Sequence, residues 1–312
     1  MKYYFIVNPK AGKKDSRTYF MPMVEKYLNN NNIDYEICVT EYAGHGAKLA
    51  QDIIENTKDK IRVIAVGGDG TIHEVAQACI NQPNVSLGLL PCGSGNDFLK
   101  SFGSQEEFFD LDALINGKDY LIDVIYSNYK SGINICSVGL DAKICTNIER
   151  YKKLPFISGS VTYNLSVVKE LLGKLGDELE IVVDDEKIYK DKYLFAVVAN
   201  GKCYGGGYNP TPNALLDDGL LDCVLIKVPS KIQLPALVNA YKKGTYLTLP
   251  IADGLITTFR CKKVSIRGIK QVDINFDGEI INNLQIDFEV LPKALKIIVP
   301  KNCKVESLIN YL

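Results

Sequence analysis

Three short apolar segments in the first hundred residues each end in a loop that is rich in glycine or proline. These segments are Lys2–Val7, Arg62–Val66 and Ser86–Leu90, and a helix is expected after each loop. Strands and helices that alternate at this spacing predict βαβ units and a parallel sheet. Ligands bind beyond the carboxyl ends of the strands in such a sheet, so we expect the three loops to converge on one site.

The pattern changes after Asp123, where strands follow one another with few helices between them. This predicts an antiparallel β-sandwich, and a length of 312 residues favours two domains. We therefore expect an α/β plus all-β fold: a three-layer α/β domain over residues 1–123, a β-sandwich over 124–292, and an active-site cleft between them. The apolar run Ala294–Val299 is expected to lead residues 293–312 back to the first domain. The expected strands are 2–7, 35–39, 62–66, 86–90, 133–138, 179–183, 193–198, 220–227, 264–266, 272–276 and 284–290, and the expected helices are 20–28, 46–54, 72–80, 142–152, 162–172 and 232–241.

The sequence Gly-Gly-Asp-Gly-Thr at residues 67–71 is the most informative of the loops. Its glycines can bring bare backbone N–H groups against an anion, and the helix that follows adds the positive end of its dipole. Phosphate is the expected ligand. Because Asp69 would repel phosphate unless a cation lay between them, Mg²⁺ is implied as well. A tight turn with Thr71 as an ordinary helix N-cap is the alternative.

The other two loops carry weaker signals of the same kind. Residues 8–14 (Asn-Pro-Lys-Ala-Gly-Lys-Lys) offer a strand-end turn with cationic side chains, and a solvated basic loop is the alternative. Residues 91–97 offer more glycine backbone, with Ser94 as a hydroxyl donor and Asp97 as a helix cap; a plain loop with an N-cap is the alternative. Three such loops at neighbouring strand ends favour a nucleotide site.

Composition and missing motifs exclude several classes of protein. Lys and Arg number 36 against 37 Asp and Glu, so no nucleic-acid partner is expected. The sequence has no P-loop, no Gly-x-Gly-x-x-Gly after the first strand, no Gly-x-Ser-x-Gly and no His-Glu-x-x-His. Nine scattered cysteines and two histidines predict a reducing compartment and no zinc site. Without an apolar run near ~18 residues or a signal-peptide core, we expect a cytoplasmic protein.

Acidic residues in the second half add candidates for a site. Residues 209–220 form a proline-rich loop whose Asp218 and backbone carbonyls would suit a hard cation, with an Asx turn as the alternative. Phe-Asp-Gly-Glu at residues 276–279 is typical of a hairpin turn, which by itself predicts no chemistry. Asp123 and Asp141 lie at predicted segment ends, where they either cap structure or face the cleft.

Taken in order, these motifs resemble the diacylglycerol kinase catalytic-domain superfamily, which includes sphingosine kinases, ceramide kinases and soluble bacterial lipid kinases. The Gly-Gly-Asp-Gly-Thr loop alone is shared with NAD kinases, but the ordered set is more specific. The resemblance implies an α/β nucleotide domain, a C-terminal β-sandwich, and transfer of the γ-phosphoryl group of ATP to a lipid hydroxyl. ATP and Mg²⁺ would be the cofactors, and diacylglycerol the preferred acceptor, giving phosphatidic acid. The matching segments are residues 8–12, 67–71, 93–98, 137–142, 205–207, 212–214, 218–221 and 276–279.

The resemblance also implies catalytic and nucleotide-binding residues. Glu279 would act as the general base, which accepts the proton of the attacking hydroxyl. Asp69 would help to organise the nucleotide and the catalytic Mg²⁺. His73 stands where many relatives have Asn, and we expect it to pack rather than to bind nucleotide. The residues implied in ATP binding are Asn8, Pro9, Lys10, Ala11, Gly12, Thr40, Gly67, Gly68, Asp69, Gly70, Thr71, Glu74 and Ser94.

A second, structural Mg²⁺ is implied by the same resemblance. Asp218 and the backbone carbonyls of Leu215 and Leu220 would hold this ion. An acid network of Asp97 and Asp123 would link it to the active site. These assignments follow from the resemblance and not from the spacing of the residues.

Two other functions stay open. An NAD kinase is disfavoured by the first loop, by the Asp218 loop and by the absence of an Asn-Glu pair after the Gly-Gly-Asp-Gly-Thr loop. A catalytically silent nucleotide-binding regulator is disfavoured because Asp69, Asp218 and Glu279 are retained. Within the lipid kinases, a sphingoid base or phosphatidylglycerol is an alternative acceptor.

A lipid substrate implies transient contact with a membrane surface. Lys13, Lys14 and Arg17, together with residues 152–156 (Lys-Lys-Leu-Pro-Phe), would form a basic and apolar contact with anionic lipid. A solvated charged face is the alternative. A homodimer is compatible with the sequence but is not predicted by any motif.

Overall fold

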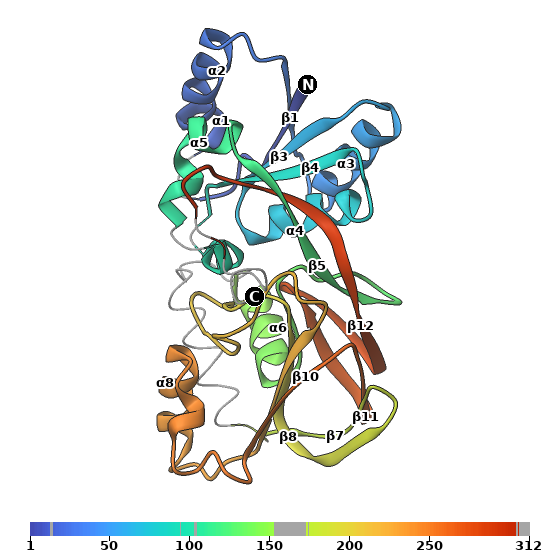
Figure 1. The fold of residues 1–312 in the computed structure, drawn as a ribbon. Helices are drawn as coiled ribbons and strands as arrows, with labels where there is room; N and C mark the ends of the chain where they lie inside the picture. The colour runs from blue at the N-terminus through green and yellow to red at the C-terminus, as the bar shows by residue number, and fades with distance from the viewer. Residues whose placement is uncertain are drawn as a thin grey trace.

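The computed structural model describes residues 1–12, 15–93, 95–102, 105–152, 173, 175–303 and 305, without the side chains of residues 105 and 147–152. Figure 1 shows an upper α/β domain and a lower domain built mainly of strands. The elements of the first domain are β1 (Lys2–Val7), α1 (Ser16–Tyr19), α2 (Met21–Asn30), β2 (Tyr35–Val39), α3 (His45–Glu55), β3 (Ile61–Gly67), α4 (Asp69–Cys79), β4 (Val85–Pro91), η1 (Phe98–Phe102), η2 (Gln105–Phe109) and α5 (Leu111–Ile115). The elements that follow are β5 (Lys118–Ser127), β6 (Ile135–Gly139), α6 (Leu140–Lys152), β7 (Asp177–Val183), β8 (Lys187–Ala199), β9 (Leu221–Lys227), α8 (Leu234–Lys243), η3 (Tyr246–Thr248), β10 (Ile256–Cys261), β11 (Lys263–Phe276) and β12 (Glu279–Val299).

The first domain has a parallel sheet with the strand order β2-β1-β3-β4. Successive side chains of a strand point to opposite faces of the sheet, so an apolar strand can bury both faces. Phe5 and Val7 of β1 pack with α2 and α5 on one face. Tyr4 and Ile6 pack with α3 and α4 on the other face. The predicted three-layer α/β domain is therefore confirmed.

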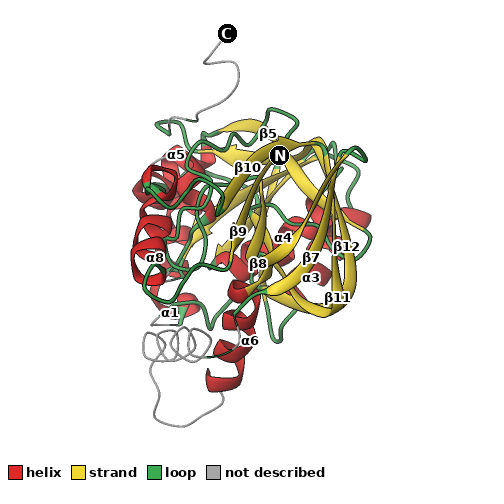
Figure 2. Ribbon diagram, turned by 90° about the horizontal axis from the view of Figure 1, so that it is seen from below, coloured by secondary structure: helices red, strands yellow, loops and turns green. Residues whose placement is uncertain are grey.

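The second domain is a sandwich of antiparallel strands. The long strands β8 and β11 each pair with both β6 and β7, so they bend from one layer into the other and enclose an apolar interior. Val138, Ile181 and Phe276 belong to this interior. On the outer face, α6 and α8 cover β6, β8 and β9 (Figure 2). Leu140 and Leu237 are among the side chains that make this contact. This confirms the predicted β-sandwich.

Two long strands, β5 and β12, run from one domain into the other (Figure 1). β12 pairs with β11 at its start, with β5 along much of its length, and in parallel with β4 through Ile297 and Leu87. The chain therefore returns to the sheet of the first domain. The register of β5 and β12 shifts between Leu291 and Leu295, close to where the sequence predicts the domain boundaries.

Several elements differ from those predicted. The two strands expected between residues 264 and 276 are one strand, β11, with an irregularity between Arg267 and Val272. β5 and β10 were not expected as strands. The helix expected at residues 162–172 lies outside the described residues. In the described part of the chain, no helix is both long enough and apolar enough to cross a membrane.

Candidate active site

Asn8 connects the loop after β1 to the loop after β3. Its side-chain Nδ2 donates to Thr71 Oγ1 at 3.0 Å, and its Oδ1 accepts the Lys10 backbone N–H at 3.0 Å. Its backbone N–H donates to the carbonyl of Val66, so the loop starts in line with the parallel sheet. The helix α4 begins at Asp69 with Gly68 as its N-cap, so the interpretation of Thr71 as a plain N-cap is wrong.

Glycine is required where the three loops approach one another. Gly12 has a φ of +82°, and a Cβ at this residue would lie 2.3 Å from the carbonyl oxygen of Cys92. A Cβ on Gly93 would lie 2.6 Å from the Cα of Gly68. No side chain caps α4, which leaves its N-terminal N–H groups to a ligand or to water. The loops thus form a cradle of backbone suited to an anion.

The cradle encloses a cavity of about 320 Å³. The expected convergence of the three loops is therefore observed, although Ser94 lies outside the described residues. Five of the described residues implied in ATP binding do not line the cavity: Pro9, Lys10, Thr40, Gly67 and Glu74. Thr40 is buried after β2, and Glu74 accepts the backbone N–H groups of Gly44 and Gly46 at the start of α3. The residues that line the cavity are Asn8, Ala11, Gly12, Gly68, Asp69, Gly70, Thr71, Gly93 and Gly95.

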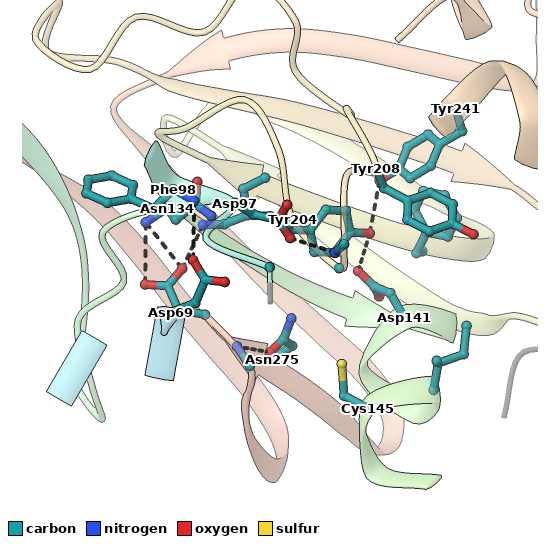
Figure 3. A pocket seen from close by; sticks show the side chains of 18 of the residues that line it. Asp69, Asp97, Phe98, Asn134, Asp141, Cys145, Tyr204, Tyr208, Tyr241 and Asn275 are labelled. Carbon is teal, nitrogen blue, oxygen red and sulfur yellow. Dashed lines mark hydrogen bonds between the residues drawn. The ribbon is translucent and has the colours of Figure 1, made fainter. Parts of the chain in front are cut away.

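A larger cavity of about 680 Å³ lies between the two domains. One end is polar and contains Asp69, Asp97 and Asn134, and the other contains the aromatic rings of Tyr208 and Tyr241 (Figure 3). Apolar side chains from α6, β8 and α8 line the wall between. The lining residues are Asp69, Ile72, His73, Gly95, Asp97, Phe98, Ile133, Asn134, Ile135, Leu140, Asp141, Ile144, Cys145, Leu194, Phe195, Tyr204, Gly205, Gly206, Tyr208, Leu237, Val238, Tyr241, Lys242, Asn275, Asp277 and Gly278.

The two cavities share Asp69 and Gly95, so they meet at the start of α4. Asp69 Oδ1 accepts the Phe98 backbone N–H at 3.4 Å. Burial, with a smaller contribution from the nearby carboxylate of Asp97, raises the pKa of Asp69 from its usual 3.8 to about 6. A carboxylate placed at such a cost to the fold is a candidate functional group.

Asp97 is buried in the wall of the larger cavity. Its Oδ1 lies 2.5 Å from Lys100 Nζ, and its Oδ2 accepts the Gly206 backbone N–H at 2.6 Å. These contacts fix a loop of the second domain on the first domain. Asp97 therefore has a structural role besides any role in an acid network.

Asp123 is fully buried at the register shift between β5 and β12. Its carboxylate oxygens accept the backbone N–H groups of Lys293 and Gly219, at 2.7 and 2.6 Å. Burial raises the pKa of Asp123, and these two hydrogen bonds oppose that effect. The contact with Gly219 brings Asp123 to the loop that carries Asp218, as an acid network between the two would require.

Asp218 is a buried carboxylate with an incomplete set of partners. Its Oδ1 accepts the Leu220 backbone N–H at 3.0 Å, while its Oδ2 contacts the guanidinium of Arg260 without the geometry of a hydrogen bond. Arg260 also lies 3.3 Å from Asp222, and burial raises the pKa of Asp222 to about 6. Among the described residues no group of three or more His, Cys, Asp or Glu could hold a metal. A cation at the buried Oδ2 of Asp218 would share this oxygen with the Arg260 guanidinium or displace it, and the carboxylate itself is a ligand of the kind that Mg²⁺ prefers.

Glu279 begins β12, directly after a turn in which Asp277 and Gly278 have positive φ. Asp277 and Gly278 line the larger cavity, whereas Glu279 does not. The Glu279 side chain is 42% exposed, and its Oε2 contacts Lys130 Nζ. It therefore lies beside the cavity, next to two residues that line it.

Two further carboxylates shape the cavity: Asp141, for which the sequence left a cap or a place at the cleft open, and Asp277, whose role the sequence did not indicate. The Asp277 carboxylate accepts the backbone N–H groups of residues 133–135, which anchors the turn before Glu279. The Asp141 Oδ2 accepts the hydroxyl of Tyr204 at 2.8 Å, and that hydroxyl lies 3.1 Å from the hydroxyl of Tyr241. The Asp-Gly pair signalled the turn, but nothing in the sequence signalled where these carboxylates point.

Comparison with known families agrees with this architecture. The diacylglycerol kinase catalytic domain matches residues 2–126, and the YegS C-terminal NAD kinase beta sandwich-like domain matches residues 134–299. The fold and these matches define a phosphotransferase that uses an alcohol group as acceptor. The chain belongs to the diacylglycerol kinase catalytic domain family, in the form that carries the YegS-type C-terminal domain.

Individual relatives span almost the whole chain. A protein of Klebsiella pneumoniae named "Probable lipid kinase YegS-like" is 30% identical over 279 residues, which are 88% of this chain and 90% of the relative. A "Diacylglycerol kinase" of Staphylococcus saprophyticus is 25% identical over 98% of this chain and 97% of its own length. The crystal structure of a diacylglycerol kinase from Bacillus anthracis has the same fold, with a TM-score of 0.67, 22% identity, and coverage of 95% of this chain and 96% of that one.

Proposed function

We propose that the protein transfers the γ-phosphoryl group of ATP to a lipid hydroxyl, with diacylglycerol as the preferred acceptor and phosphatidic acid as the product. The observation that carries this proposal is the junction of the two cavities at Asp69 and Gly95. One cavity is lined by backbone suited to phosphate, and the other is large and mostly apolar. Phosphoryl transfer depends on placing these two substrates in contact, and the junction is where they would meet.

The ATP phosphates would lie in the cradle of the three loops. The N-terminal N–H groups of α4 and the backbone at Gly12 and Gly68 would compensate their charge. Asn8 and Thr71 would hold the cradle in shape through their mutual hydrogen bond. Lys10 would add a positive charge, since it follows Asn8 in the same turn.

The lipid would occupy the larger cavity with its hydroxyl toward Asp69. The cavity volume of about 680 Å³ lies within the range for small-molecule sites, roughly 300–1,000 Å³. The apolar wall suits acyl chains, and the polar end suits a glycerol head. An acceptor that must leave a membrane to enter this cavity implies transient contact with a lipid surface. Of the basic contact proposed for Lys13, Lys14, Arg17 and residues 152–156, residues 13, 14 and 153–156 lie outside the described residues, and Arg17 forms an ion pair with Asp15.

Glu279 would serve as the general base. The lipid O–H bond breaks as its oxygen forms the bond to the γ-phosphorus, the proton passes to the Glu279 carboxylate, and ADP leaves. The exposed, rotatable side chain of Glu279 would approach the hydroxyl when the lipid is bound. Asp69 would fix the orientation of the reacting groups at the junction, where closure of the two domains excludes water.

Mg²⁺ is the cation that a kinase of this kind would use. When bound, it supplies charge neutralisation on the phosphate oxygens. Asp69 would hold the ion near the nucleotide. Asp218, with the carbonyls of Leu215 and Leu220, would hold a structural ion, and Asp97 and Asp123 would connect that loop to the active site. The buried carboxylate of Asp218, which already faces a cationic group in Arg260, supports the structural site.

NAD is the second candidate acceptor, because the C-terminal family that matches this chain has a β-sandwich like that of NAD kinases. A sphingoid base or phosphatidylglycerol would keep the lipid kinase function and change the acceptor. The apolar wall of the larger cavity favours a lipid over a dinucleotide, which would require polar contacts for two phosphates and two sugars.

The test is transfer of label from γ-labelled ATP in the presence of Mg²⁺. Diacylglycerol, sphingosine and phosphatidylglycerol are presented separately in anionic mixed micelles, and NAD is presented in solution. Glu279→Gln is compared with Glu289→Gln, which changes an exposed glutamate of the same strand. We expect labelled phosphatidic acid with the native protein and the control, and at least a 100-fold loss with Glu279→Gln. Label in NAD alone, or in no acceptor, would refute the proposal.

A further inference from the structure

His73 lies close both to Glu279 and to Asp277 in the turn that precedes it. The imidazole lies on α4 and is 1% exposed. Its Nδ1 lies 3.1 Å from Asp277 Oδ2, and its Nε2 lies 3.9 Å from Glu279 Oε1. Within the described part of the chain, Nε2 has no hydrogen-bond partner although it is buried. A buried ring nitrogen aimed at a carboxylate and left without a partner requires an explanation.

The contacts of Asp277 determine which ring nitrogen carries the hydrogen. Its two oxygens accept the backbone N–H groups of Ile133 and Ile135 at 2.7 Å each, and that of Asn134 at 3.2 Å. A carboxyl group that accepts hydrogen bonds at both oxygens is ionised. It therefore also accepts from His73, so that Nδ1 carries a hydrogen, and in the neutral ring Nε2 then presents a lone pair.

Glu279 consequently lies between one group that stabilises its ionised form and one that can accept a hydrogen bond from its protonated form. Lys130 Nζ contacts Oε2 and stabilises the carboxylate. His73 Nε2 faces Oε1 and can form a hydrogen bond only after Glu279 has gained a proton. The present separation of 3.9 Å would shorten with the rotation of Glu279 toward the bound lipid.

We propose that His73 is a positioning residue that receives, through Glu279, the proton of the lipid hydroxyl. This inference rests on the proposed role of Glu279 as the general base. The hydroxyl proton moves to a Glu279 oxygen as the O–P bond forms. The new O–H of Glu279 then donates to His73 Nε2, and transfer of the proton breaks that O–H bond and forms N–H. The resulting imidazolium is paired with the Asp277 carboxylate, and the proton returns to water through the partly exposed Glu279.

The charged groups around this path come from three parts of the fold. Asp277 and Glu279 belong to the turn and to β12, and Lys130 precedes β6. Asp69 lies on α4 itself and lines the same cavity as His73. Glu74 follows His73 on α4, but both of its oxygens accept backbone N–H groups of α3. Of these described groups, only Glu279 combines a position facing Nε2 with access to solvent.

Two substitutions separate the functions of the two ring nitrogens. His73→Asn keeps an amide donor near the position of Nδ1 and lacks an acceptor at the position of Nε2. His73→Gln reaches the position of Nε2 and can present its carbonyl oxygen to a protonated Glu279. His45, the other histidine of the chain, is half-buried or exposed at the start of α3, and His45→Gln is the control.

Steady-state kinetics with labelled ATP and diacylglycerol over pH 5–9 provide the first test. We expect His73→Asn to lower kcat roughly tenfold, less than the 10²–10⁴-fold that direct proton acceptors contribute. Its KM values should stay within twofold, and the acidic limb of its kcat profile should move to lower pH because protonated Glu279 loses its acceptor. His73→Gln should recover part of kcat. Wild-type kcat and pH profile in His73→Asn would overturn the proposal, as would equal losses in both variants with no change in the profile.

Nitrogen NMR of protein with ¹⁵N-labelled histidine tests the geometry without any assay of activity. With His45→Gln leaving one histidine, we expect the signals of a neutral ring with hydrogen on Nδ1. The Nε2–H tautomer would overturn the proposal. If the NMR result holds and the protein labels no lipid, the proposed function fails while the arrangement of His73 stands, so the two failures can be told apart.

Discussion

Replacing Asp69 by Asn separates what this residue does for the reaction from what it does to the fold. Burial and the neighbouring Asp97 raise the pKa of Asp69 from 3.8 to about 6, so the ionised form is disfavoured in the native protein. Asn is of similar size, carries no charge, and keeps an oxygen that can accept the Phe98 backbone N–H. We expect Asp69→Asn to abolish kinase activity and to increase the free energy of unfolding at neutral pH.

The size of the increase in the free energy of unfolding follows from the pKa of Asp69. At 1.36 kcal/mol per pKa unit, the change from 3.8 to about 6 corresponds to at most about 3 kcal/mol when the group is fully ionised. Asp69 lines both cavities, so water screens part of this penalty, and we expect roughly 1–2 kcal/mol. The folded-state pKa lies above the unfolded one, so the stability that the protonated form contributes is complete below about pH 3.8 and is lost as the pH rises through about 6. The increase in the free energy of unfolding caused by Asp69→Asn should therefore be small at pH 4.5 and reach its full size by pH 7.5.

Urea unfolding at pH 4.5, 6 and 7.5, without Mg²⁺ or nucleotide, measures this dependence. Asp52→Asn, an exposed change on α3, is the matched control and should stay within ±0.5 kcal/mol at every pH. A gain for Asp69→Asn that does not grow with pH, or a loss of stability at pH 7.5, would refute the reasoning. In that case the native fold would tolerate the ionised carboxylate without penalty.

Three further changes test other parts of the site. Gly12→Ala places a Cβ against a backbone carbonyl at positive φ, so isothermal titration should show at least tenfold weaker ATP binding; unchanged affinity would contradict the packing of the loops. Arg260→Gln leaves Asp218 without its cation and should reduce the free energy of unfolding by about 2 kcal/mol in Mg²⁺-free buffer, with partial recovery in Mg²⁺; a loss that Mg²⁺ does not change would argue against the structural ion. Tyr204→Phe removes the hydrogen bond to the buried Asp141 and should destabilise the protein by about 1–2 kcal/mol in thermal unfolding, while a neutral effect would mean that Asp141 needs no donor.

The convergence of the loops could be predicted because it depends only on local pattern and on the rules of parallel sheets. The apolar runs that end at Val7 and Val66, each followed by a loop that contains glycine, were enough to place two loops at one edge. The sequence could not predict that Gly12 lies against Cys92 or that Gly93 lies against Gly68, because these contacts join loops from different strands. Pattern identified the residues but not their neighbours.

The limits of the prediction are clearest at Glu74 and Asp277. Glu74 belongs to the helix of the phosphate loop, yet its carboxylate caps the backbone of a different helix, a tertiary contact that no local motif records. Asp277 was recognised as a turn residue, but the backbone donors that it anchors are about 140 residues distant in sequence. His73 was expected only to pack, because its partners come from that same distant turn.

The long strand β12 has a consequence for the order in which the protein assembles. Its final residues pair with β4 and with β5, so the sheet of the first domain is completed by a segment synthesised after the whole second domain. On the ribosome, β4 of the first domain would remain an edge strand, with Leu87 unpaired on its open side, until residues near Ile297 emerge. A chain that stops before this point would therefore leave the phosphate cradle on a sheet that lacks its neighbouring strand.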